Sequence, residues 1–141
     1  CDGFHVHPVM CRVAIAAKGL GGVMAITDGT GGSGLTVGST ARLGGQQIRV
    51  TEQAALLDEG TLAGSTLTMD RAFRTIVTAF GLSIVEAATL CCTTPARKLG
   101  LTGLGVLAEG AFGDVVVLDR GFRVVRTFLA GVEVYRSGSV A

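Results

Sequence analysis

Short apolar runs, separated by glycine and proline, organise the beginning of the chain. Residues 3–7 form a strand-like run that ends at Pro8, and residues 23–27 form a second apolar run bounded by turn residues. Between them, residues 9–18 have the apolar spacing of a helix that ends at a glycine-rich turn. A strand, a helix and a strand over so short a span predict a βαβ unit with parallel strands.

The pattern changes to short alternating stretches over residues 35–57, which predict antiparallel strands. Gly44 and Gly45 indicate a hairpin turn between two of them. Arg42 and Arg49 are expected to face solvent there. The sequence therefore predicts a β-hairpin excursion from the preceding βα pattern.

Helical spacing returns over residues 67–80, and Ser65 is the expected N-cap of this helix, with Thr66 as the competing candidate. Ser83 and Glu86 have the spacing of a capping box, which predicts a second helix to about residue 93. Pro95 is expected to begin another short helix, which ends before Gly100.

Strand patterns return in the last part of the chain. Residues 115–119, 122–129 and 132–135 are rich in β-branched residues, and the last two segments are joined around Ala130 and Gly131. They predict a small antiparallel module without a catalytic constellation.

Composition narrows the class of protein. The 141 residues are 48% hydrophobic and 16% charged, with a formal net charge of +1. Neither a basic field for nucleic acid nor an apolar run long enough for a membrane span is present in the sequence. The mean hydropathy of +0.55 predicts strands buried on both faces, or a large surface covered by a partner.

Four cysteines are present, and none belongs to a CxxC motif: Cys1, Cys11, Cys91 and Cys92. They are interpreted as small buried hydrophobic residues in a reducing cytoplasm rather than as disulfides or zinc ligands. The chain opens without an initiator methionine and without a visible signal peptide, so it is expected to be a piece of a longer cytoplasmic protein.

Asp28 is the strongest candidate for chemistry. It follows the apolar run 23–27 and precedes a glycine-rich loop, so it would lie at the carboxyl end of a strand, where α/β folds hold catalytic groups. Its separation from His5 matches one loop-helix-loop-strand repeat, which would bring both side chains to one mouth. The alternatives are an acid that caps a turn and a histidine of the core or of a turn.

The small residues before residue 67 are a second candidate. Leu62, Ala63 and Gly64 lead into the expected helix, where exposed backbone N–H groups can meet an anion or a sugar oxygen. The alternative is an ordinary helix cap.

These segments together resemble one enzyme family. The motifs are DGFHV at residues 2–6, ITD at 26–28, GTLAGS at 60–65, LTM at 67–69, TPAR at 94–97 and GVLAEGAFGDVVVLD at 105–119. Their order is similar to the C-terminal part of the N-acetylglucosamine-6-phosphate deacetylases. The last motif on its own is typical of the wider amidohydrolase superfamily.

The resemblance implies an α/β fold, namely the C-terminal part of a (β/α)8 TIM-like barrel plus part of a small β-sandwich domain. Residues 1–102 would supply the barrel portion, with the hairpin excursion at about 35–57. Residues 103–141 would supply strands of the sandwich.

The resemblance also implies roles for individual residues. Asp28 matches the family's catalytic acid and base, while His5, Leu62, Ala63 and Gly64 match residues that contact the sugar. A divalent metal, zinc by expectation, would be held by ligands outside this chain, so the chain alone would be inactive. The implied partners are an amino-sugar phosphate, the missing N-terminal part and a second copy in a homodimer, with no nucleic acid or membrane.

Two other hypotheses remain at this point. One is a related amidohydrolase that acts on another acylated amino sugar or on a cyclic amide. The other is a truncated, inactive interaction module, which the high hydropathy favours.

Overall fold

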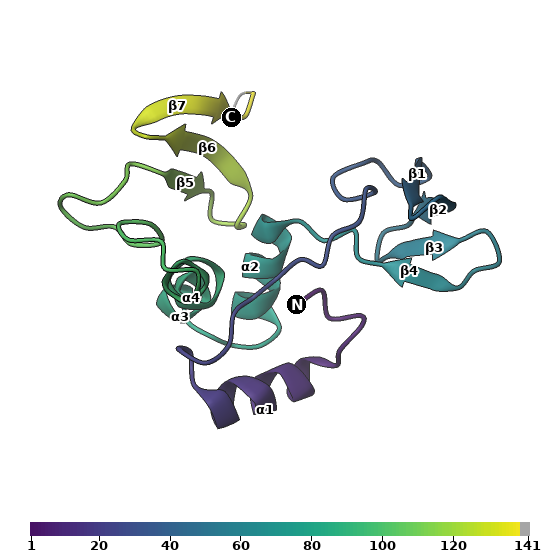
Figure 1. The fold of residues 1–141 in the computed structure, drawn as a ribbon, viewed down its shortest axis with the longest axis horizontal. Helices are drawn as coiled ribbons and strands as arrows, with labels where there is room; N and C mark the ends of the chain where they lie inside the picture. Colours follow the sequence, from purple (N-terminus) through teal and green to yellow (C-terminus); the bar gives the residue numbers. More distant parts are fainter. Residues whose placement is uncertain (139–141) are drawn as a thin grey trace.

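The computed structural model describes residues 1–138, which form a mixed structure of helices and strands (Figure 1). In chain order the elements are α1 (Pro8–Lys18), β1 (Thr40–Leu43), β2 (Gln46–Val50), β3 (Ala55–Leu57), β4 (Leu62–Gly64), α2 (Met69–Thr78), α3 (Ile84–Ala88), η1 (Thr89–Thr93), α4 (Thr94–Lys98), β5 (Val115–Leu118), β6 (Val124–Leu129) and β7 (Val132–Arg136). In Figure 1, α2 lies between the two small sheets, and α1 lies at the bottom of the view.

The first sheet contains the predicted hairpin. Its strand order is β1-β2-β3-β4 and every pair is antiparallel. Leu43 pairs with Gln46 across the turn at Gly44 and Gly45, which confirms the predicted hairpin. In β2, Ile48 and Val50 are buried whereas Arg49 is exposed, because successive side chains of a strand point to opposite faces.

The second sheet confirms the antiparallel module predicted near the end of the chain. Its order is β5-β6-β7, with both pairs antiparallel. Glu133 accepts hydrogen bonds from Arg136 and Arg126, and these bonds hold the pKa of its carboxyl below the usual value. A charged network therefore joins β6 to β7.

The hydrophobic core lies where α2 and α3 meet the segment before Asp28. The buried cluster comprises Ala25, Ile76, Phe80, Ala87 and Leu90. The segment of residues 19–34 passes along α2 in Figure 1, and Ala25 donates its N–H to the carbonyl of Leu90 over 2.9 Å. Packing therefore fixes the residues that precede Asp28.

The predicted capping box is confirmed. The Ser83 hydroxyl accepts from the Glu86 N–H, and the Glu86 carboxylate accepts from the Ser83 N–H over 2.8 Å. The helix continues without a break through α3, the π-helical η1 and α4, so the second and third predicted helices are one.

Glu86→Gln is expected to reduce the pH dependence of stability. Hydrogen bonds from the Ser83 backbone and hydroxyl lower the pKa of Glu86 below 4.5. A group with a lowered folded pKa contributes stability above its unfolded pKa, and this contribution is lost as pH falls through the folded value. Glutamine keeps the capping geometry without the charge. Urea unfolding between pH 6 and about 3 measures the effect.

The control is Glu109→Gln, which removes an exposed glutamate before β5. An unchanged pH dependence in Glu86→Gln would contradict the role of its charge.

The two strands predicted for the βαβ unit, residues 3–7 and 23–27, do not form in the described structure, so this prediction is wrong. Residues 3–6 form bends, and residues 23–27 have no strand partner; Gly29 alone forms a parallel bridge, with Ser65. A strand exists only when neighbouring backbone supplies its hydrogen bonds. The helix between the two segments is confirmed as α1.

The predicted N-cap is also wrong. Residues 62–64 form β4, and α2 begins four residues beyond Ser65, with Thr68 in the N-cap position. The Ser65 hydroxyl accepts from the Leu67 N–H instead.

The four cysteines are free thiols in the structure, but their burial differs from the expectation. Cys91 is partly buried, and this burial, helped by the nearby Cys92, raises the pKa of its thiol to about 11. Cys92 is exposed and the other three cysteines are only partly buried, so the expectation that the cysteines are buried is wrong.

A broad apolar surface remains open on the helical part. Helix α1 buries none of its residues, and Val9, Met10 and Val13 are more than half exposed. The described part of the chain contains no helix with the length and apolarity needed to cross a membrane.

Candidate functional site

Asp28 ends the segment that packs on the core, and its side chain is exposed. Its φ of +49° is in the left-handed region, which aspartate tolerates better than most residues. Within residues 1–138 no hydrogen bond to its carboxylate is found. The carboxylate is therefore held on a packed backbone and open to a ligand.

The loop after Asp28 is attached to the end of β4. Three groups donate to the Ser65 carbonyl: the Thr30 N–H over 3.0 Å, the Thr30 hydroxyl over 3.1 Å and the Ser33 hydroxyl over 3.4 Å. Together with the parallel bridge of Gly29 and Ser65, these bonds bring the Asp28 loop beside residues 62–64. Two candidate segments far apart in sequence thus become neighbours.

Gly64 is the point of closest approach between those segments. Its φ is +127°, and a Cβ there would lie 2.7 Å from the Thr30 methyl carbon. Ala63 and Gly64 are partly buried, whereas Leu62 is exposed. Only a residue without a side chain fits between β4 and the Asp28 loop.

Gly64→Ala is expected to destabilise the protein by about 1–3 kcal/mol more than Gly60→Ala, because the added methyl overpacks against Thr30. Gly60 is the matched control, since its φ is also positive, +84°, and its Cβ would meet nothing within 4 Å. Urea unfolding of both variants measures the difference. Equal losses would show that the approach to Thr30 is not constrained.

His5 belongs to a different cluster near the start of the chain. Its Nδ1 bonds to the carboxylate of Asp2, and its ring meets Phe4 edge-on at 5.7 Å between centroids. None of its hydrogen bonds in the described structure reaches Asp28. The described structure therefore shows no direct hydrogen bond between His5 and Asp28, and their common mouth stays a prediction.

Asp2 is a residue whose role sequence reasoning missed. Burial raises the pKa of its carboxyl, but the hydrogen bonds from His5 and from two backbone N–H groups outweigh burial and leave the pKa below its usual value. The signal was the Asp-Gly pair ahead of His5, which is typical of a turn closed by a side chain. His7 has a structural role, because its Nδ1 accepts from the Val9 N–H at the start of α1.

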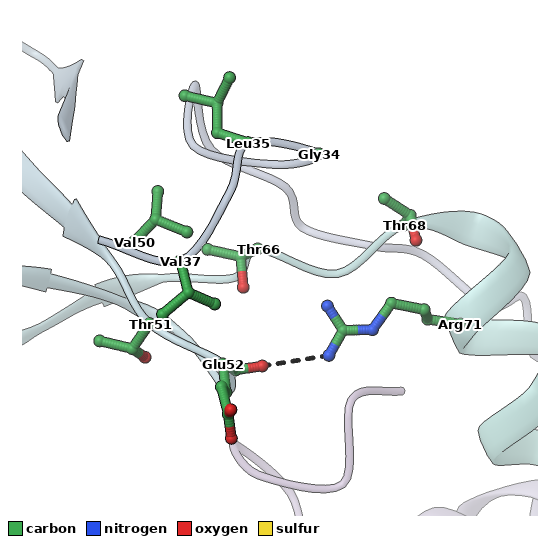
Figure 2. A pocket seen from close by; sticks show the side chains of 9 residues that line it. All are labelled: Gly34, Leu35, Val37, Val50, Thr51, Glu52, Thr66, Thr68 and Arg71. Atoms are coloured by element: carbon green, nitrogen blue, oxygen red, sulfur yellow. Dashed lines mark hydrogen bonds between the residues drawn. The ribbon is translucent and has the colours of Figure 1, made fainter. Parts of the chain in front are cut away.

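A cavity of about 240 Å³ lies next to the Asp28 loop. It is lined by Gly34, Leu35, Val37, Val50, Thr51, Glu52, Thr66, Thr68 and Arg71 (Figure 2). Arg71 extends from α2 across this space and donates to the Glu52 carbonyl over 3.1 Å. The contact ties α2 to the segment that follows β2.

The described residues do not by themselves fit a metal site. Among residues 1–138, no group of three histidine, cysteine, aspartate or glutamate side chains is arranged to hold an ion. Structural and catalytic zinc sites require three or four such ligands.

Comparison with known proteins gives a consistent result, although no family model matches the chain. The N-acetylglucosamine-6-phosphate deacetylase of Lysinibacillus sphaericus is 36% identical over 130 residues, which are 92% of this chain and 33% of that protein. A putative N-acetylgalactosamine-6-phosphate deacetylase of Escherichia coli K12 is 36% identical over 132 residues, which are 77% of its length.

Solved structures agree. The N-acetylglucosamine-6-phosphate deacetylase of Thermotoga maritima matches 97% of this chain and 38% of its own, with a TM-score of 0.85 and 35% identity. A variant of the Mycobacterium smegmatis enzyme, in complex with N-acetyl-D-glucosamine-6-phosphate, matches 94% of the chain with a TM-score of 0.84 and 36% identity.

The chain spans about a third of the length of most of the curated relatives it matches. The agreement nevertheless extends over nearly all of this chain, in sequence and in fold. The chain therefore belongs to the N-acetylglucosamine-6-phosphate deacetylase family.

Proposed function

We propose that the protein containing this chain removes the N-acetyl group of N-acetylglucosamine 6-phosphate, with glucosamine 6-phosphate and acetate as products. The observation that carries the proposal is the attachment of the Asp28 loop to the end of β4 through Ser65. It joins an open carboxylate to the segment that the family resemblance assigns to sugar contact.

Asp28 is the proposed general base and acid. Amide hydrolysis needs a group that takes a proton from the attacking water and returns one to the leaving amine. An exposed carboxylate on a packed backbone suits this exchange, because substrate and water can reach it and its backbone is held in position. His5, Leu62, Ala63 and Gly64 are proposed to contact the sugar phosphate.

The fold proposal extends to the whole enzyme. Residues 1–102 would form the C-terminal portion of a (β/α)8 barrel, and residues 103–141 would contribute to the small β-sandwich domain. Further barrel strands would pair with residues 3–7 and 23–27 and would cover the open apolar face that includes α1. A homodimer in the cytoplasm is part of the same proposal.

A divalent metal, zinc by expectation, belongs to the proposal through the family resemblance. Its ligands would come from residues outside this chain. Residues 1–141 alone are accordingly proposed to have no deacetylase activity.

A second candidate substrate is N-acetylgalactosamine 6-phosphate. Two relatives, from Shewanella and from Escherichia coli O157:H7, carry this substrate in their names and are 35% and 36% identical to the chain. Two relatives that are named N-acetylglucosamine-6-phosphate deacetylases have similar identities, 36% and 33%. Overall identity therefore does not separate the two sugars, which differ only in the configuration of one hydroxyl.

The test is acetate release by the complete encoded protein from each of the two sugar phosphates and from unphosphorylated N-acetylglucosamine. A higher kcat/KM on N-acetylglucosamine 6-phosphate supports the proposal, and a higher value on the galactose epimer supports the second candidate. A preference for the unphosphorylated sugar would favour a related amidohydrolase. Absence of hydrolysis of any of these, in a folded and metal-supplied protein, would favour an interaction module.

A further inference from the structure

The side chain of Asp2 collects hydrogen bonds from the residues that follow it. Its Oδ1 accepts from the N–H of Phe4 over 3.0 Å and from the N–H of His5 over 3.2 Å, while its Oδ2 bonds to His5 Nδ1. The side chain of Asp2 is 10% exposed and that of His5 is 28% exposed. The Asp2 carboxylate is therefore the less exposed member of the pair.

This arrangement has a consequence for the two nitrogens of His5. An ionised carboxylate only accepts hydrogen bonds, and the lowered pKa of Asp2 keeps it ionised at neutral pH. Nδ1 must therefore carry the proton that it shares with Asp2. The second nitrogen, Nε2, is left for an external group.

An aromatic ring and a helix lie next to the Asp2–His5 pair. The Phe4 ring packs edge-on against the imidazole at 87° between the ring planes. The turn that precedes it, with Gly3 at a φ of +76°, lies against α2, because a Cβ on Gly3 would be 4.0 Å from the Thr75 methyl carbon. The turn that carries the dyad therefore passes close to α2.

We propose that Asp2 is a positioning residue that holds His5 in the Nδ1–H form and directs Nε2 to the amino-sugar phosphate. The inference rests on the proposed function, in which His5 contacts the substrate. It adds the residue that selects the ring nitrogen used for recognition. A purely structural Asp2, which only closes the backbone turn, is the competing explanation.

Asp2→Asn separates the two explanations. The side-chain oxygen of the introduced asparagine still accepts from the N–H groups of Phe4 and His5, so the turn is kept. Its amide NH₂ now faces Nδ1 as a donor, which moves the proton of neutral His5 to Nε2. A structural role survives this exchange, whereas the positioning role does not.

The experiment records ¹H–¹⁵N imidazole spectra of the complete protein, with the His5 signals assigned by their loss in His5→Gln. The expected result is the Nδ1–H form in the wild type and the Nε2–H form in Asp2→Asn, with KM for the preferred sugar phosphate raised about tenfold and kcat changed less, the size expected for one substrate hydrogen bond. Asp58→Asn, at an exposed aspartate before β4, is the matched control and should change neither quantity.

An unchanged tautomer in Asp2→Asn would overturn the proposal. A changed tautomer with an unchanged KM would also overturn it, because His5 would then not meet the substrate through the selected nitrogen. Both outcomes leave deacetylation by the wild type intact. Failure of the proposed function is distinct, since it would appear as a wild-type protein that hydrolyses none of the sugars.

Discussion

Asp28→Asn is expected to lower the kcat of the complete protein by about 10²–10⁴-fold, the range that proton transfer by a positioned side chain contributes. Asparagine matches aspartate in shape and tolerates the left-handed φ of +49°, so the backbone is preserved. The side chain is exposed, and the free energy of unfolding should therefore change by less than about 0.5 kcal/mol. Steady-state acetate release measures kcat, and urea unfolding measures stability.

The matched control for this prediction is Asp58→Asn, which makes the same chemical change at another exposed aspartate. It should leave kcat and KM as in the wild type. If Asp28→Asn retained kcat within a few-fold of the wild type, Asp28 would be a turn residue and the acid and base would lie elsewhere in the protein.

Phe80→Ala is expected to destabilise the protein by about 3–5 kcal/mol. Phe80 is 1% exposed and is one of the largest fully buried side chains, in the cluster that joins α2 to Ala25 and Leu90. Its removal leaves a cavity where the segment before Asp28 is held. Urea unfolding monitored by circular dichroism gives the change in free energy.

Phe112→Ala provides the comparison, because Phe112 is 59% exposed. This substitution should lower the free energy of unfolding by less than about 1 kcal/mol. Similar losses at both positions would indicate that the cluster around Phe80 is not the main core of this part of the protein.

The sequence correctly predicted the elements whose contacts are local. The hairpin at Gly44 and Gly45 joins strands that are adjacent along the chain, and the same holds for the β5-β6-β7 meander. The capping box of Ser83 and Glu86 spans one helical turn. In each case the interacting groups belong to the same helical turn or to strands that follow one another along the chain, so residue type and spacing suffice to predict them.

The sequence did not correctly predict the elements that depend on backbone from distant parts of the chain. Residues 3–7 and 23–27 have the composition of strands, yet the described structure gives them no strand partner. Ser65 is a residue type that favours the N-cap position. Its carbonyl instead accepts hydrogen bonds from Thr30 and Ser33, more than thirty residues earlier, and the segment before it pairs as β4. Apolar pattern predicts burial and cannot by itself supply a hydrogen-bonding neighbour.

The candidate site divides in the same way. Residue types and motif order were enough to nominate Asp28, His5 and residues 62–64 as candidates, because a carboxylate, an imidazole and small residues have characteristic chemistry; their roles stay predictions. Their mutual arrangement depended on tertiary contacts: the Gly29–Ser65 bridge, the fit of Gly64 against Thr30 and the Asp2–His5 pair. The physical reason is that a side chain's chemistry is local, whereas its neighbours are selected by packing and backbone pairing over the whole fold.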